Sequence, residues 1–325
     1  MNEKVKNQVI GVDISLDETS YAIVDVRGNI IAREGFETQP HPDLSEYVGY
    51  LSERIVMLAE CNGGFENIRS MGISAPSGNF LTGCIENAPN LQWKGVVPMA
   101  AMLRDQLGIA VALGNDAHLA GLGEHAFGCA HGMNNFVLIT LGHGIGSCIF
   151  SNGDVHLGAD GFAGEVGHTC VTYNGRVCGC GKKGCLEAYC GANGIVKTAQ
   201  EMMAESDQPS LMRTIERLTP KKITECCEQG DEMAIEVYRR TGVILGTAMA
   251  GYASLLDPEA IVFAGGVSHA GHWLLEPAHE VFENLVFRNT RGRVKFLTSA
   301  LDDHERDVLG ASALAWGIKE YSLFK

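Results

Sequence analysis

The sequence predicts an α/β protein made of two similar halves. In each half a strand, a polar or glycine-rich turn and a returning strand precede helices; the pattern first begins at Gln8 and begins again at Phe136. The length of 325 residues also suits two domains, because one domain commonly takes about 150 residues. An apolar fraction of 46% with 20% charged residues is typical of globular proteins. We therefore expect an internally duplicated α/β fold.

Apolar periodicity and turn residues define the elements of each half. In the first half we expect strands at 8–14, 21–26, 30–32, 68–73 and 110–113, and helices at 43–60 and 99–107. In the second half we expect strands at 136–141, 147–151, 260–263 and 294–297, and helices at 117–127, over much of 193–256 and at 309–321. A glycine- and cysteine-rich loop region spans 158–191.

Composition excludes several classes of function. Acidic residues outnumber basic ones 39 to 25, and this net charge of −14 disfavours a nucleic-acid binder. The longest uncharged stretch, Thr241 to Leu256, is shorter than the roughly 20 apolar residues of a membrane span, so we expect a buried helix there. The N-terminus has no apolar signal-peptide core, so we expect a cytoplasmic protein. Eleven cysteines in such a protein are not expected to form a disulfide framework.

One histidine and three cysteines lie close together in the glycine-rich loop. His168 is followed by Cys178, Cys180 and Cys185, a set of four ligands that suits tetrahedral Zn²⁺. Four protein ligands leave no open position for a reacting water, so the expected role of the zinc is structural. The alternative is that these are surface thiols or form a disulfide among themselves. Cys190 follows on an expected helix and is left out of the set.

Two carboxylates bracket this loop. Glu165 precedes it and Glu187 follows it, and two rigidly held carboxylates are good acceptors for neighbouring sugar hydroxyls. Taken alone, each would more often be a solvated surface residue.

Longer motifs resemble a known family. The runs GNDAHLAGLGE, LGHGIG, EVGH, CGCGKKGCLE and FAGGVS occur in the order found in the ROK family (repressor, open reading frame, kinase), and the chain is most similar to its glucokinase-type sugar kinases. The resemblance covers essentially the whole chain, and the cysteine signature is its most specific part. It implies a two-lobed, actin-like and ribonuclease-H-like fold, with ATP and sugar between the lobes, and a homodimer. The lobes are expected at 1–117, with a C-terminal helix at about 310–325 packing back on it, and at 118–309.

The resemblance also implies roles for single residues. Asp116 corresponds to the general base that accepts the proton of the attacking sugar hydroxyl. The residues implied in sugar binding are Asn79, Asn115, Asp116, Glu165, His168 and Glu187. His168 is expected to bind zinc through one ring nitrogen and a sugar hydroxyl through the other. The residues implied around ATP and Mg²⁺ are Asp13, Gly142, His143, Gly144, Gly146, Gly265 and Gly266. Without this context, Asp116 would be read as a helix N-cap and Asp13 as a turn residue.

The first phosphate turn departs from the family pattern Asp-x-Gly-Gly-Thr. Ser15 and Leu16 replace the two glycines and Asp17 stands in place of the hydroxyl, so we expect strain at Leu16 and crowding of the phosphates. A carboxylate ~4 Å from a phosphate charge costs on the order of 4 kcal/mol at an effective dielectric near 20. In the second turn His143 replaces the usual Thr, and a protonated His143 would offset part of this repulsion.

Two functional hypotheses remain open, and a third is disfavoured. The first is an ATP- and Mg²⁺-dependent kinase that phosphorylates glucose or a close relative at the 6-hydroxyl. The second is a non-catalytic sugar-binding sensor or regulator of the same family, with a degraded phosphate turn. A DNA-binding repressor is disfavoured because seven residues precede Gln8, too few for a helix-turn-helix, and because the charge is acidic. The sequence leaves the choice of hexose or N-acetylhexosamine open.

Overall fold

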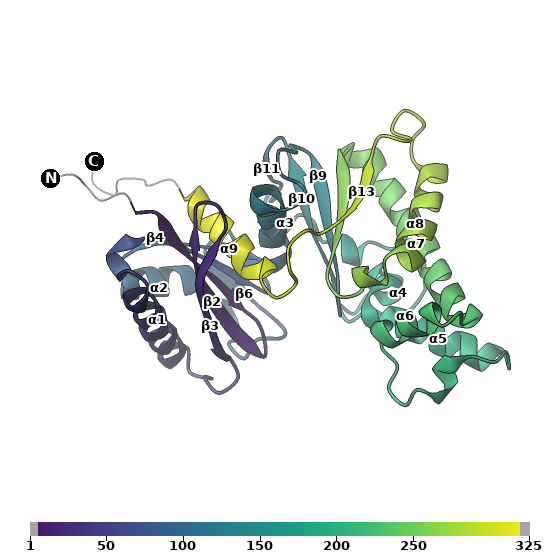
Figure 1. Ribbon diagram of the computed structural model, residues 1–325, viewed down its shortest axis with the longest axis horizontal. Helices are drawn as coiled ribbons and strands as arrows, with labels where there is room; N and C mark the ends of the chain where they lie inside the picture. The colour runs from purple at the N-terminus through teal and green to yellow at the C-terminus, as the bar shows by residue number, and fades with distance from the viewer. Residues whose placement is uncertain (1–5, 319–325) are drawn as a thin grey trace. The chain divides into compact units, whose positions relative to one another are not determined.

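The computed structural model describes residues 6–318, which form two compact units (Figure 1). Unit 1 comprises residues 6–132, 157–163 and 300–318, and unit 2 comprises residues 133–156 and 164–299. The expected boundary after residue 117 falls inside helix α3 (Asp116–Phe127). This helix belongs to unit 1 because Leu119 packs against Ala311 and Leu314 of α9 (Arg306–Gly317).

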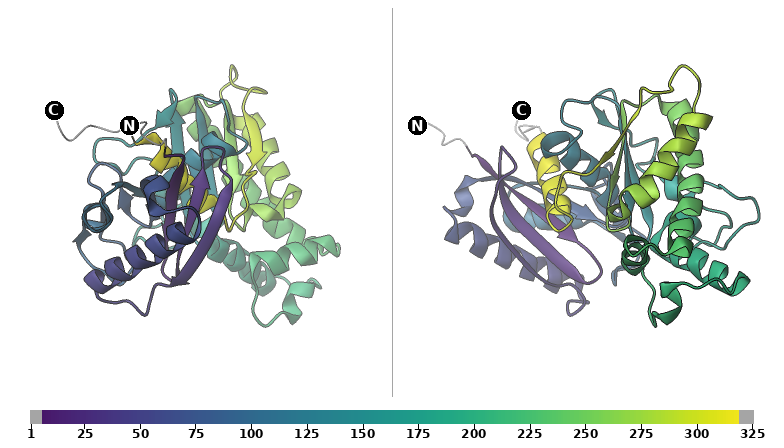
Figure 2. Two further views of the ribbon diagram at one scale, coloured as in Figure 1. Left: turned by 60° about the vertical axis from the view of Figure 1, so that its left-hand side comes forward. Right: turned by 45° about the vertical axis from the view of Figure 1, so that its right-hand side comes forward.

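Unit 1 is built on a five-stranded sheet with helices on both faces. The strand order is β3–β2–β1–β4–β8, with bounds Ile30–Glu37, Glu18–Asp25, Gln8–Ile14, Ile68–Ala75 and Ala110–Asn115. β1, β2 and β3 run antiparallel, whereas β4 and β8 run parallel to β1. Helices α1 (Leu44–Cys61) and α2 (Met99–Leu107) cover one face, and Figure 2 shows α9, in yellow, on the opposite face.

Strand alternation and two glycines fix the position of α9. Along β1, Ile10 and Val12 pack with α1, whereas Val9 packs with α9. A Cβ at Gly11 would lie 2.1 Å from the Val308 carbonyl oxygen, and one at Gly72 would lie 1.9 Å from that of Ala311. The helix therefore lies directly on the backbone of β1 and β4, at a separation that only glycine permits.

Unit 2 repeats the topology of unit 1. Its strand order is β11–β10–β9–β12–β13, with bounds Asp154–Val155, Ile145–Ser151, Phe136–Leu141, Ala260–Ala264 and Lys295–Thr298. Again three antiparallel strands are followed by two that run parallel to the first. The expected internal duplication is confirmed, and the repeated unit has the ribonuclease-H-like topology.

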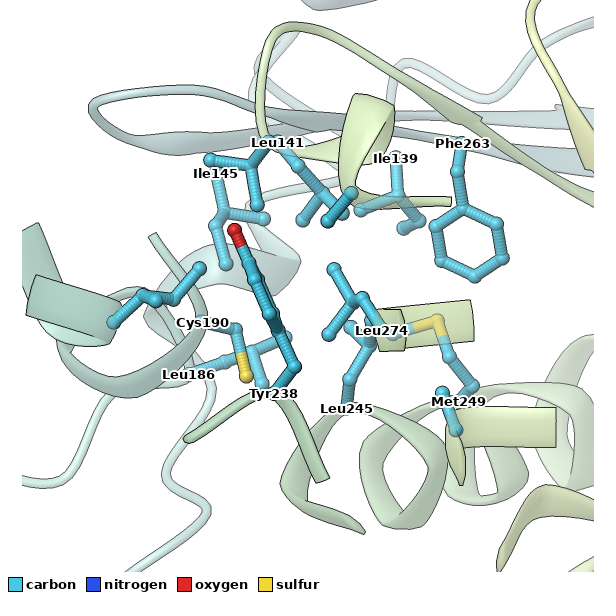
Figure 3. Close-up of a cluster of buried hydrophobic side chains, with 14 of the residues drawn as sticks. Ile139, Leu141, Ile145, Leu186, Cys190, Tyr238, Leu245, Met249, Phe263 and Leu274 are labelled. Carbon is cyan, nitrogen blue, oxygen red and sulfur yellow. The ribbon is translucent and has the colours of Figure 1, made fainter. Parts of the chain in front are cut away.

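Helices α7 (Glu232–Leu256) and α8 (His272–Leu285) cover one face of this second sheet. In Figure 3, Leu245 and Leu274 from these helices lie below Ile139 and Phe263 of the strands. Leu186 also belongs to this core and directly follows Cys185. One end of the cysteine-rich loop is therefore anchored in the interior of unit 2.

The remaining elements are short or lie outside the two sheets. Unit 1 contains a small sheet of β5 (Gly78–Asn79), β6 (Cys84–Glu86) and β7 (Val96–Val97). Unit 2 contains α4 (Glu187–Cys190), α5 (Ala192–Glu205) and α6 (Pro220–Glu228). No helix within 6–318 combines the length and the apolar character needed to cross a membrane.

Most expected elements are confirmed; β11 was not expected, β3 runs on to Glu37 beyond the expected 30–32, and there are three further differences. Helix α8 was not expected, because it contains Pro277, a residue that usually disfavours a helix interior. The small β5–β6–β7 sheet was not expected either, because its strands are too short for a periodic signal. The last helix, expected at 309–321, begins at Arg306 and ends at Gly317, and Ile318 is no longer helical. Residues 319–321 of the expected helix lie outside the described residues.

Candidate functional site

Unit 1 brings three carboxylates into one neighbourhood. Asp13 lies near the end of β1, on the face that carries α9, and Asp307 is the second residue of α9. Burial raises the pKa of Asp13 well above its usual value, and the negative charges of Asp307 and Asp116 raise it further. Burial likewise raises the pKa of Asp307. A nearby cation would therefore stabilise the charged form of Asp13.

Asn115 and Asp116 divide two tasks at the start of α3. The Asn115 Oδ1 caps the helix by accepting from the backbone N–H groups of Ala117 at 3.0 Å and His118 at 3.4 Å. Asp116 is the first helical residue, and its exposed carboxylate accepts from the Ala117 N–H at 2.7 Å. The alternative reading of Asp116 as the N-cap is thus wrong, because Asn115 is the cap.

Asn79 is buried, and its side chain holds local structure. Its Nδ2 donates to the Asp160 carbonyl at 2.9 Å, and its Oδ1 accepts from the Leu81 N–H at 2.9 Å. The first bond attaches segment 157–163 to the rest of unit 1, and the second fixes the loop that carries Asn79. A sugar contact by Asn79 would have to use the remaining N–H of the amide.

The turn between β1 and β2 closes without the expected strain. The Ser15 N–H and hydroxyl both donate to the Glu18 carbonyl, at 3.0 and 2.8 Å. Leu16 is exposed and its backbone does not adopt a positive φ, so the expectation of strain at this residue is wrong. The Asp17 carboxylate accepts from the Gln39 side chain at 3.2 Å. The turn is thus closed by hydrogen bonds between Ser15, one of the residues that replace the glycines, and Glu18.

In the glycine turn of unit 2, some backbone N–H groups form hydrogen bonds within the turn itself or to the strand before it. The Gly142 N–H donates to the Gly144 carbonyl at 3.0 Å, and the Gly146 N–H donates to the Thr140 hydroxyl at 3.1 Å. Among the described residues, the N–H groups of His143 and Gly144 make no hydrogen bond, and both residues are exposed. These two groups are the available anion donors of the turn.

The second glycine loop packs against the first. The Val267 N–H donates to the Leu141 carbonyl at 3.0 Å, just before the 142–146 turn. Gly265 has a φ of 86°, and a Cβ there would lie 2.7 Å from the same carbonyl oxygen. Gly266 is exposed at the tip of the loop. The two expected nucleotide-binding loops therefore lie side by side in unit 2.

The predicted metal ligands converge. The ligand atoms of His168, Cys178, Cys180 and Cys185 all lie within 4.8 Å of one another. The Cys178 Sγ lies 3.7 Å from His168 Nδ1, and the Sγ atoms of Cys180 and Cys185 lie 3.7 Å apart. Two ligands at zinc-binding distances of about 2.0–2.3 Å from a tetrahedral centre are separated by roughly 3.5–3.8 Å. The arrangement thus fits a structural zinc ion, which these four residues would hold.

Burial at one ligand of the cluster, Cys178, favours the presence of a cation. It raises the pKa of the Cys178 thiol to about 12, so this sulfur would remain protonated at neutral pH without a positive partner. A bound divalent cation supplies that partner and deprotonates the thiols.

Glu187 connects the segment that carries the predicted metal ligands, residues 168–185 (the metal loop), to the turn at residues 142–146 (the glycine turn). Its Oε2 accepts from the Ile145 N–H at 3.1 Å, and its Oε1 lies 3.3 Å from Cys178 Sγ. A Cβ at Gly144 would lie 2.9 Å from Oε2. Glu165, by contrast, is exposed before the short 3₁₀ helix Val166–His168. The glutamates therefore differ: the protein holds Glu187 in place, and Glu165 extends into solvent.

Two structurally important residues gave no motif signal. Asp307 lies in an acidic run at the start of α9, and its relation to Asp13 depends on how the helix crosses the sheet. Arg176 attaches the metal loop to α5, donating to the Gly194 carbonyl at 2.9 Å and the Thr198 hydroxyl at 3.0 Å. Nothing in the local sequence pattern marks this arginine as an anchor.

Comparison with known proteins gives consistent results. A family model described as the ROK family matches residues 9–318. A glucokinase from Halalkalibacterium halodurans is 31% identical over 319 residues, which span 96% of this chain and 94% of the relative. A ROK family glucokinase from Streptomyces griseus, solved in complex with glucose and AMPPNP, has a TM-score of 0.77 at 29% identity and covers 95% of this chain and 99% of that chain.

A regulator also matches over nearly the full chain. A xylose repressor from Caldicellulosiruptor bescii is 25% identical over 310 residues, which span 94% of this chain but 77% of the repressor. The sugar kinases among the structural neighbours have the actin-like, two-lobed ATPase fold, in agreement with the duplicated topology seen here. With the family model matched from the first strand to the last helix, this chain belongs to the ROK family.

Proposed function

We propose that this protein is a ROK sugar kinase that transfers the γ-phosphoryl group of ATP to the 6-hydroxyl of glucose or a closely related hexose. The observation that carries the proposal is the division of tasks at α3: Asn115 caps the helix, and the Asp116 carboxylate is exposed. Similarity to glucokinases over nearly the whole chain supports the same reading.

In this mechanism Asp116 accepts the proton of the 6-hydroxyl as its oxygen attacks the γ-phosphorus in line. The first turn of α3 fixes the position of the carboxylate through the Ala117 N–H. The Asn115 Nδ2, which the cap does not use, donates to a neighbouring sugar hydroxyl.

The remaining sugar contacts come from the metal loop. A zinc ion held by His168, Cys178, Cys180 and Cys185 would cross-link this loop, and it supplies no reacting ligand. With Nδ1 facing the cluster, His168 carries its proton on Nε2 and donates it to a sugar hydroxyl. Glu165 and Glu187 accept from adjacent hydroxyls.

The nucleotide contacts come from the two glycine loops of unit 2. The N–H groups of His143 and Gly144 donate to phosphate oxygens, and the backbone at Gly265 and Gly266 lies against the nucleotide. Asp13 interacts with Mg²⁺, directly or through a water. The raised pKa of Asp13 means that a cation is needed to stabilise its charged form.

The test is the isosteric change Asp116→Asn. We expect turnover to fall by about 10³-fold, within the range for loss of a general base, while the Kd for the sugar stays within about threefold. Turnover is measured as ADP formation and sugar binding by calorimetry. Asp105→Asn, an exposed aspartate on α2, is the matched control and should retain full turnover. Wild-type turnover in Asp116→Asn would contradict the assignment of the base.

The alternative is a sugar-binding regulator that does not transfer phosphate. The observation that favours it is the β1–β2 turn, where Ser15, Leu16 and Asp17 form a self-contained structure with a carboxylate in place of the family's glycine and hydroxyl residues. Calorimetry with ATP–Mg²⁺ in the presence of hexose separates the two functions. Tight sugar binding without nucleotide binding would favour the regulator.

The homodimer and the identity of the hexose stay predictions. Light scattering in solution tests the first. A thermal-shift screen over hexoses and N-acetylhexosamines, with and without ATP–Mg²⁺, tests the second through the stabilisation that a bound ligand gives.

A further inference from the structure

Cys170 lies directly across from a predicted metal ligand. Cys170 and Cys185 form an antiparallel bridge within the cysteine-rich loop. The backbone hydrogen bonds on either side of this pair run from Val171 N–H to Gly184 O at 2.8 Å and from Leu186 N–H to Thr169 O at 3.0 Å. Bonds in these positions flank the pair, so Cys170 and Cys185 occupy a non-hydrogen-bonded site of the ladder.

This site has the spacing that a disulfide requires. Directly opposed residues at a non-hydrogen-bonded site have Cα atoms about 4.5 Å apart, and their side chains lie on the same face of the ladder. Disulfides are found at Cα separations of about 4.4–6.8 Å. A bond between the two sulfurs therefore needs little backbone movement.

The two cysteines differ in access to solvent. Cys170 is exposed and is not part of the four-residue ligand cluster. Cys185 is only 1% exposed and lies within that cluster. A small oxidant in solution therefore reaches Cys170 first. The buried Cys185, which is paired with Cys170 in the ladder, is then the thiol that can react with oxidised Cys170.

We propose that Cys170 and Cys185 form a reversible disulfide when a hydroperoxide oxidises Cys170, and that this disulfide removes Cys185 from the metal ligands and loosens the metal loop. The Cys170 thiolate attacks a peroxide oxygen, the O–O bond breaks, and Cys170 becomes a sulfenic acid as hydroxide leaves. The Cys185 thiolate then attacks the sulfenic sulfur, the S–S bond forms and a second hydroxide leaves. One peroxide is thereby reduced by two electrons and two thiolates are oxidised. The loop loses one of its four ligands, so its affinity for the ion falls.

A second disulfide competes for the same sulfur. Cys180 Sγ lies 3.7 Å from Cys185 Sγ, so these two ligands would pair if the ion left first. The order of events distinguishes the two routes. Oxidation that starts at the exposed Cys170 joins it to Cys185, whereas oxidation of a vacated cluster joins Cys180 to Cys185.

The experiment maps the disulfide by mass spectrometry. The zinc-loaded protein is treated with hydrogen peroxide, its free thiols are alkylated, and it is cleaved with trypsin and a glutamate-specific protease. Cleavage after Glu165, Arg176, Lys182, Lys183 and Glu187 places Cys170 alone in peptide 166–176, Cys178 and Cys180 in peptide 177–182, and Cys185 alone in peptide 184–187. Each candidate disulfide therefore joins a different pair of peptides. Zinc release is followed in parallel with a chromogenic chelator.

We expect peptide 166–176 linked to peptide 184–187, with release of zinc, and loss of the link on reduction. Cys170→Ser should lose this link and retain its zinc for longer, while Cys61→Ser, which removes an exposed cysteine on α1, should behave as wild type. A dominant link between peptides 177–182 and 184–187, or equal zinc release by wild type and Cys170→Ser, would overturn the proposal.

Of the two measurements, only zinc release depends on the proposed metal site; the mapping of linked peptides does not. If the purified protein contains no zinc, the assignment of the metal site fails, and the linked peptides still test the pairing of Cys170 with Cys185. Sugar phosphorylation is not used as a readout, so failure of the proposed activity leaves this test intact.

Discussion

Replacing Gly144 with alanine tests whether the glycine turn positions Glu187. The new Cβ would lie 2.9 Å from Glu187 Oε2, closer than a carbon and an oxygen can pack. Gly144 does not have a positive φ, so alanine fits the backbone there. The conflict therefore falls on the end of a flexible side chain, and Glu187 has to move away from the turn.

The magnitude follows from the bond that is lost. Oε2 accepts from the Ile145 N–H at 3.1 Å, and a hydrogen bond to a charged group contributes about 1.5–3 kcal/mol. If Glu187 then binds the sugar from a displaced position, the Kd for hexose should rise by roughly 10- to 100-fold. The melting temperature should change little, because the carboxylate is half-buried and can be rehydrated.

Calorimetric titration with hexose in the absence of nucleotide measures this effect. Gly142→Ala is the matched control, because its Cβ would meet only the Gly144 carbonyl oxygen, at 3.9 Å. We expect Gly142→Ala to bind hexose with an affinity close to that of wild type. The reasoning is refuted if Gly144→Ala binds hexose as tightly as Gly142→Ala does while Glu187→Gln does not bind it.

Three further predictions follow from the packing, charge and metal loop. Asp307→Asn should raise the melting temperature at pH 8 and have a smaller effect at pH 4. Because the folded state raises the pKa values of Asp13 and Asp307 above 3.8, the two carboxyl groups stabilise the fold when protonated at low pH. This stability is lost as the pH rises from about 3.8 through the raised pKa values. Gly11→Ala should destabilise the protein by about 3 kcal/mol in urea unfolding, because its Cβ would lie 2.1 Å from a backbone oxygen of α9. Removal of zinc by a chelator should weaken hexose binding at least about tenfold, with recovery on adding zinc, because His168 loses the ion that orients it.

Each of these has a clear contrary result. Equal melting temperatures for Asp307→Asn and wild type at pH 8 would mean that the two carboxylates do not repel. Gly49→Ala in α1 is the control for packing, since nothing lies within 4 Å of its added Cβ and it should stabilise by about 0.5–1 kcal/mol. A chelated protein that binds hexose normally would remove the link between the metal loop and the sugar.

Local features were predictable from the sequence. The ligands of the metal cluster lie within eighteen residues, so their convergence requires only a tight loop. The helix expected at 43–60 forms at Leu44–Cys61, with the Asp43 side chain accepting from the Glu46 N–H at 2.9 Å as its N-cap. Such contacts span a few residues and leave a clear pattern.

Contacts between distant segments were not predictable. The approach of Asp307 to Asp13 depends on where α9 crosses the sheet, and Gly11 and Gly72 set that crossing. The link from Glu187 to Ile145 joins residues 42 positions apart. The expected strain at Leu16 was wrong because the turn closes through the Ser15 side chain, a bond that the family pattern does not contain.

The chain passes between its two units four times, after residues 132, 156, 163 and 299. One short passage, residues 157–163, is tied into unit 1 by Asn79 and by His118, whose Nε2 lies 2.8 Å from the Ala163 carbonyl oxygen. Cutting the polypeptide once, at any of these connections, leaves three others intact. Limited proteolysis should therefore nick this protein without separating it into halves, and neither half can be expressed as one uninterrupted fragment.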